Sequence, residues 1–347
     1  MNKKRVVGLA FTYVGSVVGA GFSSGREIWR FFARHSVSGV YAVGIVAVFF
    51  TILAPVFFKL GKKCGIENYQ YFFYRYLPQP FSYFFDLIYS CFLFGSVSVM
   101  LAGSGAVFYN LLGLPYLIGV VITLVFVLFT LILNREGILA VNSILIPILI
   151  FITIYTVISY LSETVFIPVK MVVSKDLSLS KYNWIKDSLL YGSYNLAMAI
   201  AVMTNIVYKE EDDDITVAGI IGGILLSGLL LIIFIGLTTA FADRPSQEIP
   251  FLYLAGKAGK GIYLFYIIAL YFAMVTTATV NYYAFTKRLI SLFKVKYETG
   301  LLLALFFVLP LVPSGFSNLV DSLYPLFGVL GMLIISFYSI LLLKRKK

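Results

Sequence analysis

Long apolar runs, separated by short charged or turn-rich segments, repeat along the whole chain. A helix needs about 20 predominantly apolar residues to cross a bilayer, and the polar breaks divide this sequence into ten runs. They cover residues 6–32, 40–60, 80–108, 114–133, 137–161, 184–207, 215–241, 261–293, 300–312 and 319–343. We therefore expect an all-α polytopic membrane protein with ten transmembrane helices.

Composition and charge support this class of protein. Hydrophobic residues make up 60% of the chain and charged residues only 12%, whereas charged residues form about a quarter of a soluble domain. The net charge of +11 does not indicate nucleic-acid binding, because Lys and Arg gather at the ends of the apolar runs. Most of them lie on segments that are inside if the N-terminus is cytoplasmic, so both termini are expected in the cytoplasm.

Glycine and serine interrupt the first apolar run, in the stretch YVGSVVGAGFSSGRE at residues 13–27. An unpaired backbone group in hydrocarbon costs several kcal/mol, so broken helix is tolerated only where it is packed in protein or lines a cavity. Small residues can instead allow close packing of helices. The number of glycines and serines, followed at once by Arg26 and Glu27, favours a helix break that forms a binding site.

A second polar interruption, YGSYN at residues 191–195, lies in the sixth run. The two interrupted runs each begin a set of five, and an odd number of crossings inverts the second set. Interrupted segments at corresponding places in inverted halves are typical of transporters. We expect one membrane domain with repeats at residues 1–161 and 184–347, a connector at 162–183, and broken helices 1 and 6. Coincidence in a glycine-containing bundle is the alternative.

Broken helices offer free backbone groups to a ligand. The amides of Ala20, Gly21 and Phe22 are expected to attract a carboxylate, and the carbonyls of Gly15 and Val18 a cation. Such a site suits a zwitterion. Further substrate contacts are expected from Ser16, Tyr191, Gly192, Ser193, Tyr194 and Asn195.

Two adjacent hydroxyls lie in the eighth run, on Thr276 and Thr277. They would give a hard cation two neutral oxygens, although hydroxyls in a helix commonly bond back to the preceding turn.

The charged side chain of Arg26 costs free energy in a membrane segment, so it needs a partner or a water-filled vestibule. Asp321, near the outer end of the tenth run, is the expected partner. Glu27 is expected to pair with neighbours of Arg26 or to cap the second half-helix, where a carboxylate is favourable.

VGSVVGAGF in the first run and FAMVTT in the eighth resemble the amino acid–polyamine–organocation superfamily, which has the LeuT-type five-plus-five fold. GSVVGAGFSSGREI and YPLFGVLG resemble its YkvI-like bacterial branch, which implies a location in the bacterial plasma membrane. The resemblance implies one sodium site, made by carbonyls of Gly15, Val18 and Ala273 and by the hydroxyls of Thr276 and Thr277. The resemblance also implies an outer gate, formed by Arg26 and Asp321.

Two features of the fifth run bear on coupling. Gly137 and Pro147 resemble a Gly-x9-Pro device that lets the helix unwind toward the sodium site, and Pro147 removes an amide in any case. Some proton-coupled relatives place a lysine in this run, and ILAVNSILIPILIFITIY has none. Sodium is therefore the expected coupling ion.

These features predict a sodium-coupled symporter of a small amino acid or related zwitterion, working by alternating access in the lipid bilayer. It needs no cofactor besides the coupling ion and no nucleic-acid partner. Alternatives are a proton-coupled or uncoupled transporter and an amino-acid sensor of the germinant-receptor type. Two cysteines, one histidine and the absence of a nucleophile–base pair in the sequence argue against an enzyme.

Overall fold

A computed structural model describes residues 3–63, 74, 76–133, 137–163, 183–207, 210–241 and 245–344, and every regular element within these ranges is helical. The first half contains α1 Lys3–Val17, α2 Ala20–Ser23, α3 Arg26–Phe31, η1 Ala33–His35, α4 Val37–Val48, η2 Phe49–Leu53, α5 Ala54–Lys63, α7 Gln79–Leu112, α8 Tyr116–Leu133 and α9 Gly137–Glu163. The second half contains α10 Asn183–Val207, α11 Asp212–Ala240, α12 Phe251–Lys257, α13 Lys260–Phe293, α14 Tyr297–Val308, η3 Leu309–Ser314 and α15 Phe316–Lys344.

Within the described residues, 6 continuous helical stretches are long and apolar enough to cross a membrane. They are Val37–Lys63, Gln79–Leu112, Asp212–Ala240, Lys260–Phe293, Tyr297–Ser314 and Phe316–Leu342. Shorter apolar helical stretches lie at Tyr116–Leu131 and Pro147–Glu163. The structure is thus that of a helical, multi-span membrane protein, as the apolar runs predict.

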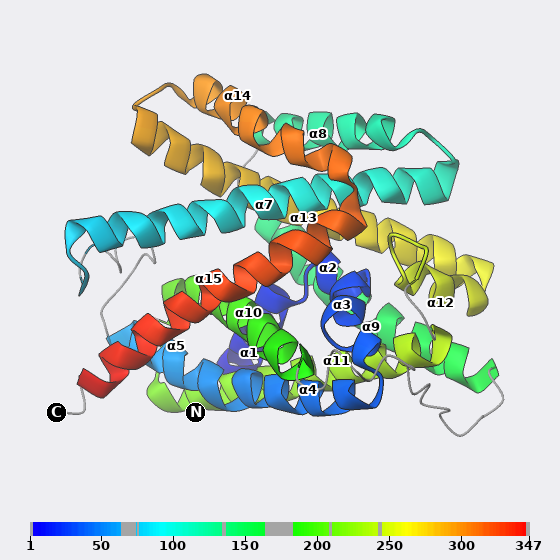
Figure 1. Ribbon diagram of the computed structural model, residues 1–347, viewed down its shortest axis with the longest axis horizontal. Helices are drawn as coiled ribbons and strands as arrows, with labels where there is room; N and C mark the ends of the chain where they lie inside the picture. Colours follow the sequence, from blue (N-terminus) through cyan, green and yellow to red (C-terminus); the bar gives the residue numbers. More distant parts are fainter. Residues whose placement is uncertain are drawn as a thin grey trace.

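The helices form two groups that face each other (Figure 1). The lower group consists of α1, α4, α5, α10 and α11, where α1 packs along α11 and α10 packs against α4 and α5. The upper group consists of α7, α8, α13 and α14, with α13 packed along α7. Because α9 and α15 each contact both groups, they join the two halves of the molecule.

Small residues let helices of the lower group approach closely. Gly223 on α11 faces the backbone of Phe50, and a Cβ at this position would collide with the Phe50 carbonyl oxygen. Such small-residue contacts are a common means of helix association in membranes. Close packing therefore explains some glycines of this chain.

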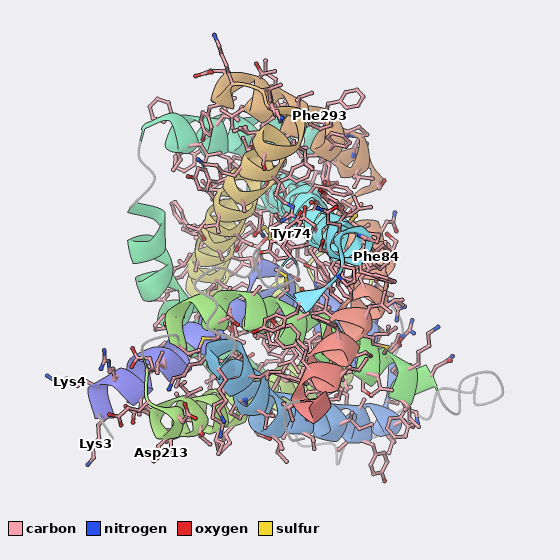
Figure 2. The ribbon with its side chains drawn as sticks, turned by 90° about the vertical axis from the view of Figure 1, so that its left-hand side faces the viewer. Lys3, Lys4, Tyr74, Phe84, Asp213 and Phe293 are labelled. Carbon is pink, nitrogen blue, oxygen red and sulfur yellow. The ribbon has the colours of Figure 1, made fainter. Side chains whose placement is uncertain are left out.

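Charged side chains gather at one end of the molecule. Lys3, Lys4 and Asp213 project there into open space (Figure 2). Arg5 Nε lies 2.9 Å from Glu210 Oε2 at this end of the chain's first helix. The basic residues at helix ends thus sit where the surface is exposed, which fits their role as topology signals.

The expected break in the sixth run is wrong, because α10 runs without interruption from Asn183 to Val207. YGSYN contains a single glycine, Gly192, and the ring of Phe49 packs against it. Asn195 Nδ2 donates to the carbonyl of Tyr191 at 3.1 Å, one helical turn earlier. Asn195 therefore bonds within its own helix, and the polar residues of this segment do not open it.

The fifth run forms α9, which begins at Gly137 and contains the exposed Pro147 without ending there. Its unwinding stays a prediction. Between α11 and α13, residues Phe251–Lys257 form the short helix α12. The expected connector at 162–183 lies almost wholly outside the described residues.

Candidate functional site

The first helix is broken as the sequence predicts. Helix α1 ends at Val17, and Gly19 has extended backbone angles of φ −100° and ψ −175° before α2 begins at Ala20. Gly25 then takes a left-handed conformation, φ 75°, which only glycine adopts without strain. Helix α3 begins at Arg26, so the chain changes direction twice within a few residues.

The break leaves backbone carbonyls exposed at the end of α1. The last carbonyls of a helix have no intrahelical partner. The amide of Gly19 lies four residues beyond Gly15 but donates at 2.9 Å to Val17 instead. The carbonyl of Val18 receives no backbone amide among the described residues. Oxygens of Gly15 and Val18 are therefore available to a cation or to water.

A cavity of about 120 Å³ lies at this break, between the two helix groups. The lower group and α2–α3 contribute small and polar residues, and α7, α13 and α15 contribute a mixed wall. The lining residues are Gly15, Ser16, Val17, Gly19, Gly21, Glu27, Phe92, Ser96, Met100, Tyr194, Asn195, Met198, Thr277, Asn281, Tyr324 and Phe327.

Glu27 is the carboxyl-bearing residue of this wall, and its side chain is only 4% exposed. Tyr194 donates its hydroxyl to Glu27 Oε2, and the hydroxyl of Tyr324 also bonds to the carboxyl group. Oε1 occupies the space beside Gly21, where a Cβ would collide with it. The sequence analysis treated Glu27 as a partner or cap and missed its place in the cavity. An ionisable residue inside a membrane segment was the signal that could have found it.

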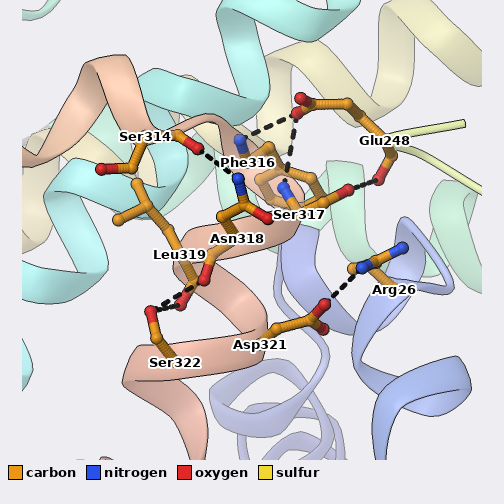
Figure 3. A network of polar contacts seen from close by, with 9 residues as sticks. All are labelled: Arg26, Glu248, Ser314, Phe316, Ser317, Asn318, Leu319, Asp321 and Ser322. Carbon is orange, nitrogen blue, oxygen red and sulfur yellow. Dashed lines mark hydrogen bonds and ion pairs between the residues drawn. The ribbon is translucent and has the colours of Figure 1, made fainter.

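Arg26 and Asp321 join α3 to α15 beside the cavity (Figure 3). Arg26 Nη2 lies 2.5 Å from Asp321 Oδ2, and Arg26 is 1% exposed. The start of α15 is fixed by Glu248, whose carboxylate accepts the amide of Phe316 at 2.8 Å. The expected pairing is therefore present, and its role as an outer gate stays a prediction.

The expected substrate residues divide between the cavity and the protein interior. Ser16, Gly21, Tyr194 and Asn195 line the cavity. The others of the set do not line it: Ala20, Phe22, Tyr191, Gly192 and Ser193.

Tyr194, Asn195 and Met198 lie three or four residues apart on α10 and face the cavity together. Tyr191 lies one helical turn before Asn195 and is not part of the cavity wall. Tyr191 packs instead against Phe32, with ring centroids 4.7 Å apart.

Of the five residues in the expected sodium set, Gly15 and Thr277 line the cavity. Val18, Ala273 and Thr276 are not in its wall. The hydroxyl of Thr276 donates to the carbonyl of Ala273 at 3.1 Å, the back-bonded arrangement that the sequence analysis left open. The described residues contain no group of three or more His, Cys, Asp or Glu side chains placed to hold a metal ion.

The broken first helix and the cavity beside it belong to a helical, multi-span membrane protein. The chain is 28% identical over 340 residues to the membrane protein YkvI of Bacillus subtilis, covering 97% of this chain and 95% of the relative. It is 26% identical over 322 residues to YyaD of the same organism, covering 92% and 91%. The chain is thus similar to these two membrane-protein relatives over almost its whole length. No protein-family model matches it.

Solved transporter structures share the fold. A manganese transporter of Eremococcus coleocola, in complex with an aromatic bis-isothiourea compound, superposes with a TM-score of 0.60 at 16% identity, covering 97% of this chain and 77% of the transporter. A mutant of that transporter gives a TM-score of 0.60 at 17% identity, with coverage of 96% and 77%. At this identity the likeness describes the fold alone.

Proposed function

We propose that the chain is a secondary active transporter that carries a small amino acid or related zwitterion together with sodium. The observation that supports this most is the cavity at the break of the first helix. Its wall comes from both helix groups and from α15. A rocking movement of one group against the other would expose such a site to each side of the membrane in turn.

The contacts between helices support ten spans in a five-plus-five repeat. In the lower group, α1 and α10 line the cavity. Helix α1 contacts α11, and α10 contacts α4 and α5. In the upper group the pair α7 and α8 corresponds to the pair α13 and α14, and α9 and α15 both bridge the groups. We propose that residues 1–161 and 184–347 form the repeats, with both termini in the cytoplasm.

Sodium is the proposed coupling ion. The carbonyls of Gly15 and Val18 lie at the end of α1, and Thr277 of α13 lines the same cavity as Gly15. Hard cations prefer oxygen ligands of this kind. To drive loading, sodium must bind one access state more tightly than the other, because an ion with equal affinity for both shifts nothing.

The wall of the cavity favours an organic cargo over manganese, the ion named for the solved neighbours. Manganese suits several carboxylate or carbonyl ligands, while Glu27 is the carboxyl-bearing residue of this wall. Phe92, Met100, Met198 and Phe327 make much of the remaining surface apolar. A compact solute with one polar end and one apolar end fits such a wall.

Uptake into vesicles tests the proposal. Purified protein is reconstituted in liposomes, and accumulation of labelled amino acids and betaines is followed with an inward gradient of sodium or of choline. Accumulation that requires the sodium gradient supports the proposal, and protein-free liposomes are the control. Binding without accumulation would instead support the sensor alternative. Accumulation driven by a proton gradient alone would overturn sodium coupling.

A further inference from the structure

Glu27 is a buried carboxyl group without a cationic side chain beside it. Its residue is 4% exposed, and no Lys, Arg or His of the described chain lies within ion-pair distance of it. Arg26, its neighbour in sequence, turns to Asp321 instead. The hydrogen-bond partners of Glu27 are the hydroxyls of Tyr194 and Tyr324.

Glu27 is thus a buried acid for which no described side chain supplies the counter-charge. A buried carboxylate is stable only when it is paired or when it takes up a proton. The described residues of the cavity wall include Glu27 but no lysine, arginine or histidine, so they supply this acid with no positive side chain. The free cavity therefore attracts a positive group and disfavours a negative one.

Aromatic side chains surround this carboxyl group. The rings of Tyr194 and Tyr324 lie with centroids 5.3 Å apart, and those of Phe92 and Phe327 with centroids 4.8 Å apart. All four residues line the cavity. Aromatic faces attract organic cations through the quadrupole of the ring. A carboxyl group among aromatic faces is a suitable receptor for an ammonium group.

We propose that Glu27 binds the ammonium group of the transported solute, so that the substrate class is small organic ammonium compounds, of which amino acids are one kind. This inference rests on the proposed function, because it concerns the same cavity. Oε1 of Glu27 lies beside Gly21, where a Cβ would collide with it. The carboxyl group is therefore held next to the break of the first helix.

Matched probes that differ in one charged group test the inference. Thermal unfolding of the purified full-length protein is measured in sodium buffer with L-alanine, ethylamine or propionate. Ligand binding to the folded state raises the unfolding temperature. We expect stabilisation by L-alanine or ethylamine, which carry an ammonium group, and none by propionate, which lacks it.

Two variants separate the charge from the fold. Glu27→Gln keeps an acceptor oxygen for both tyrosines, and should weaken binding of the stabilising ammonium probe about tenfold to a hundredfold, the worth of one hydrogen bond to a charged group. Glu298→Gln removes an exposed carboxylate at the start of α14, and should leave the affinity unchanged.

A labelling measurement in the wild-type protein does not depend on a stable variant. A hydrophobic carbodiimide modifies buried carboxyl groups, and peptide mass spectrometry reports the modification of Glu27. We expect the ammonium probe that stabilises the protein to protect Glu27, and propionate to give no protection.

Several results would overturn the inference: stabilisation by propionate as strong as by the amines, no stabilisation by either amine, full affinity in Glu27→Gln, or labelling of Glu27 that no amine reduces. Its failure is distinguishable from failure of the proposed function. Sodium-driven uptake that is unaffected in Glu27→Gln would leave the transporter in place and remove only the role of Glu27. Binding through Glu27 without any uptake would support the role of Glu27 and contradict the proposed transporter.

Discussion

The guanidinium of Arg26 and the carboxylate of Asp321 lie 2.5 Å apart and tie the broken first helix to α15. The Arg26 side chain is 1% exposed and that of Asp321 is 25% exposed. Removing one partner of a buried pair leaves the other charge without compensation. The link is therefore expected to matter both for stability and for opening of the cavity.

Asp321→Asn should lower the free energy of unfolding by about 2–3 kcal/mol, somewhat less than for a fully buried pair because Asp321 is partly exposed. Chemical denaturation of the purified protein measures this loss. Ser322→Ala, one residue further on an exposed position of α15, should stay within about 0.5 kcal/mol of the wild type. Equal stability of Asp321→Asn and the wild type would show that the pair contributes nothing.

Gly21→Ala should abolish ligand binding, because the added methyl group would occupy the space that Oε1 of Glu27 now fills. The carboxyl group must then move, and its bond from Tyr194 is disturbed. Gly8→Ala is the matched control on α1, outside the cavity wall, because nothing lies within 4 Å of its Cβ position. Thermal stabilisation by the best ligand measures both variants, and equal effects would contradict the described placement of Glu27.

Thr277→Ala should raise the sodium concentration needed for half-maximal uptake by about tenfold, the cost of one good ligand or hydrogen bond. Thr277 lines the cavity with Gly15, which makes its hydroxyl the more accessible of the adjacent pair. The double variant with Thr276→Ala should lose sodium dependence altogether. Thr279→Ala is the control on the same helix, since its hydroxyl donates to Val275 at 2.7 Å and does not line the cavity. Unchanged sodium dependence in the double variant would remove the proposed site.

Much of the fold is predictable from the apolar runs, because a bilayer fixes the length of a spanning helix. The break of the first helix is predictable as well. Gly25 adopts the left-handed conformation that the turn requires, and the other glycines of this stretch have a low helix propensity. The same reasoning failed for α10. Its polar residues include a single glycine, and Asn195 can bond to its own helix.

The site is less predictable than the fold because its composition depends on which face of each helix meets the others. The sequence marks residues 191–195 as one polar group, but in the packed structure Tyr194 and Asn195 line the cavity, whereas Tyr191, one turn earlier, packs against Phe32. Glu27 was open to several interpretations. Only the position of α3 against α10 and α15 shows that its carboxyl group meets Tyr194 and Tyr324.

A second ion cluster gives a prediction about the start of α10. Asp187 Oδ2 lies 3.1 Å from Arg30 Nη1, 2.6 Å from Arg34 Nη2 and 2.8 Å from His35 Nε2. The Asp187 side chain is 5% exposed, so the cluster ties α3 and η1 to α10 through one buried carboxylate. Mutation of this acid leaves several basic groups facing one another without a counter-charge.

Asp187→Asn should therefore destabilise the protein by about 2–4 kcal/mol, as expected when one partner of a largely buried pair is removed. Asp212→Asn is the matched control, because Asp212 forms its 2.6 Å pair with Lys62 at the surface, where their side chains are 43% and 26% exposed. Surface pairs contribute about 0–1 kcal/mol and are screened by salt. Chemical denaturation at low and high sodium chloride should show a large loss at both concentrations for Asp187→Asn, and a small loss that vanishes in salt for Asp212→Asn. Similar losses in the two variants would mean that burial of the Asp187 carboxylate does not strengthen its cluster.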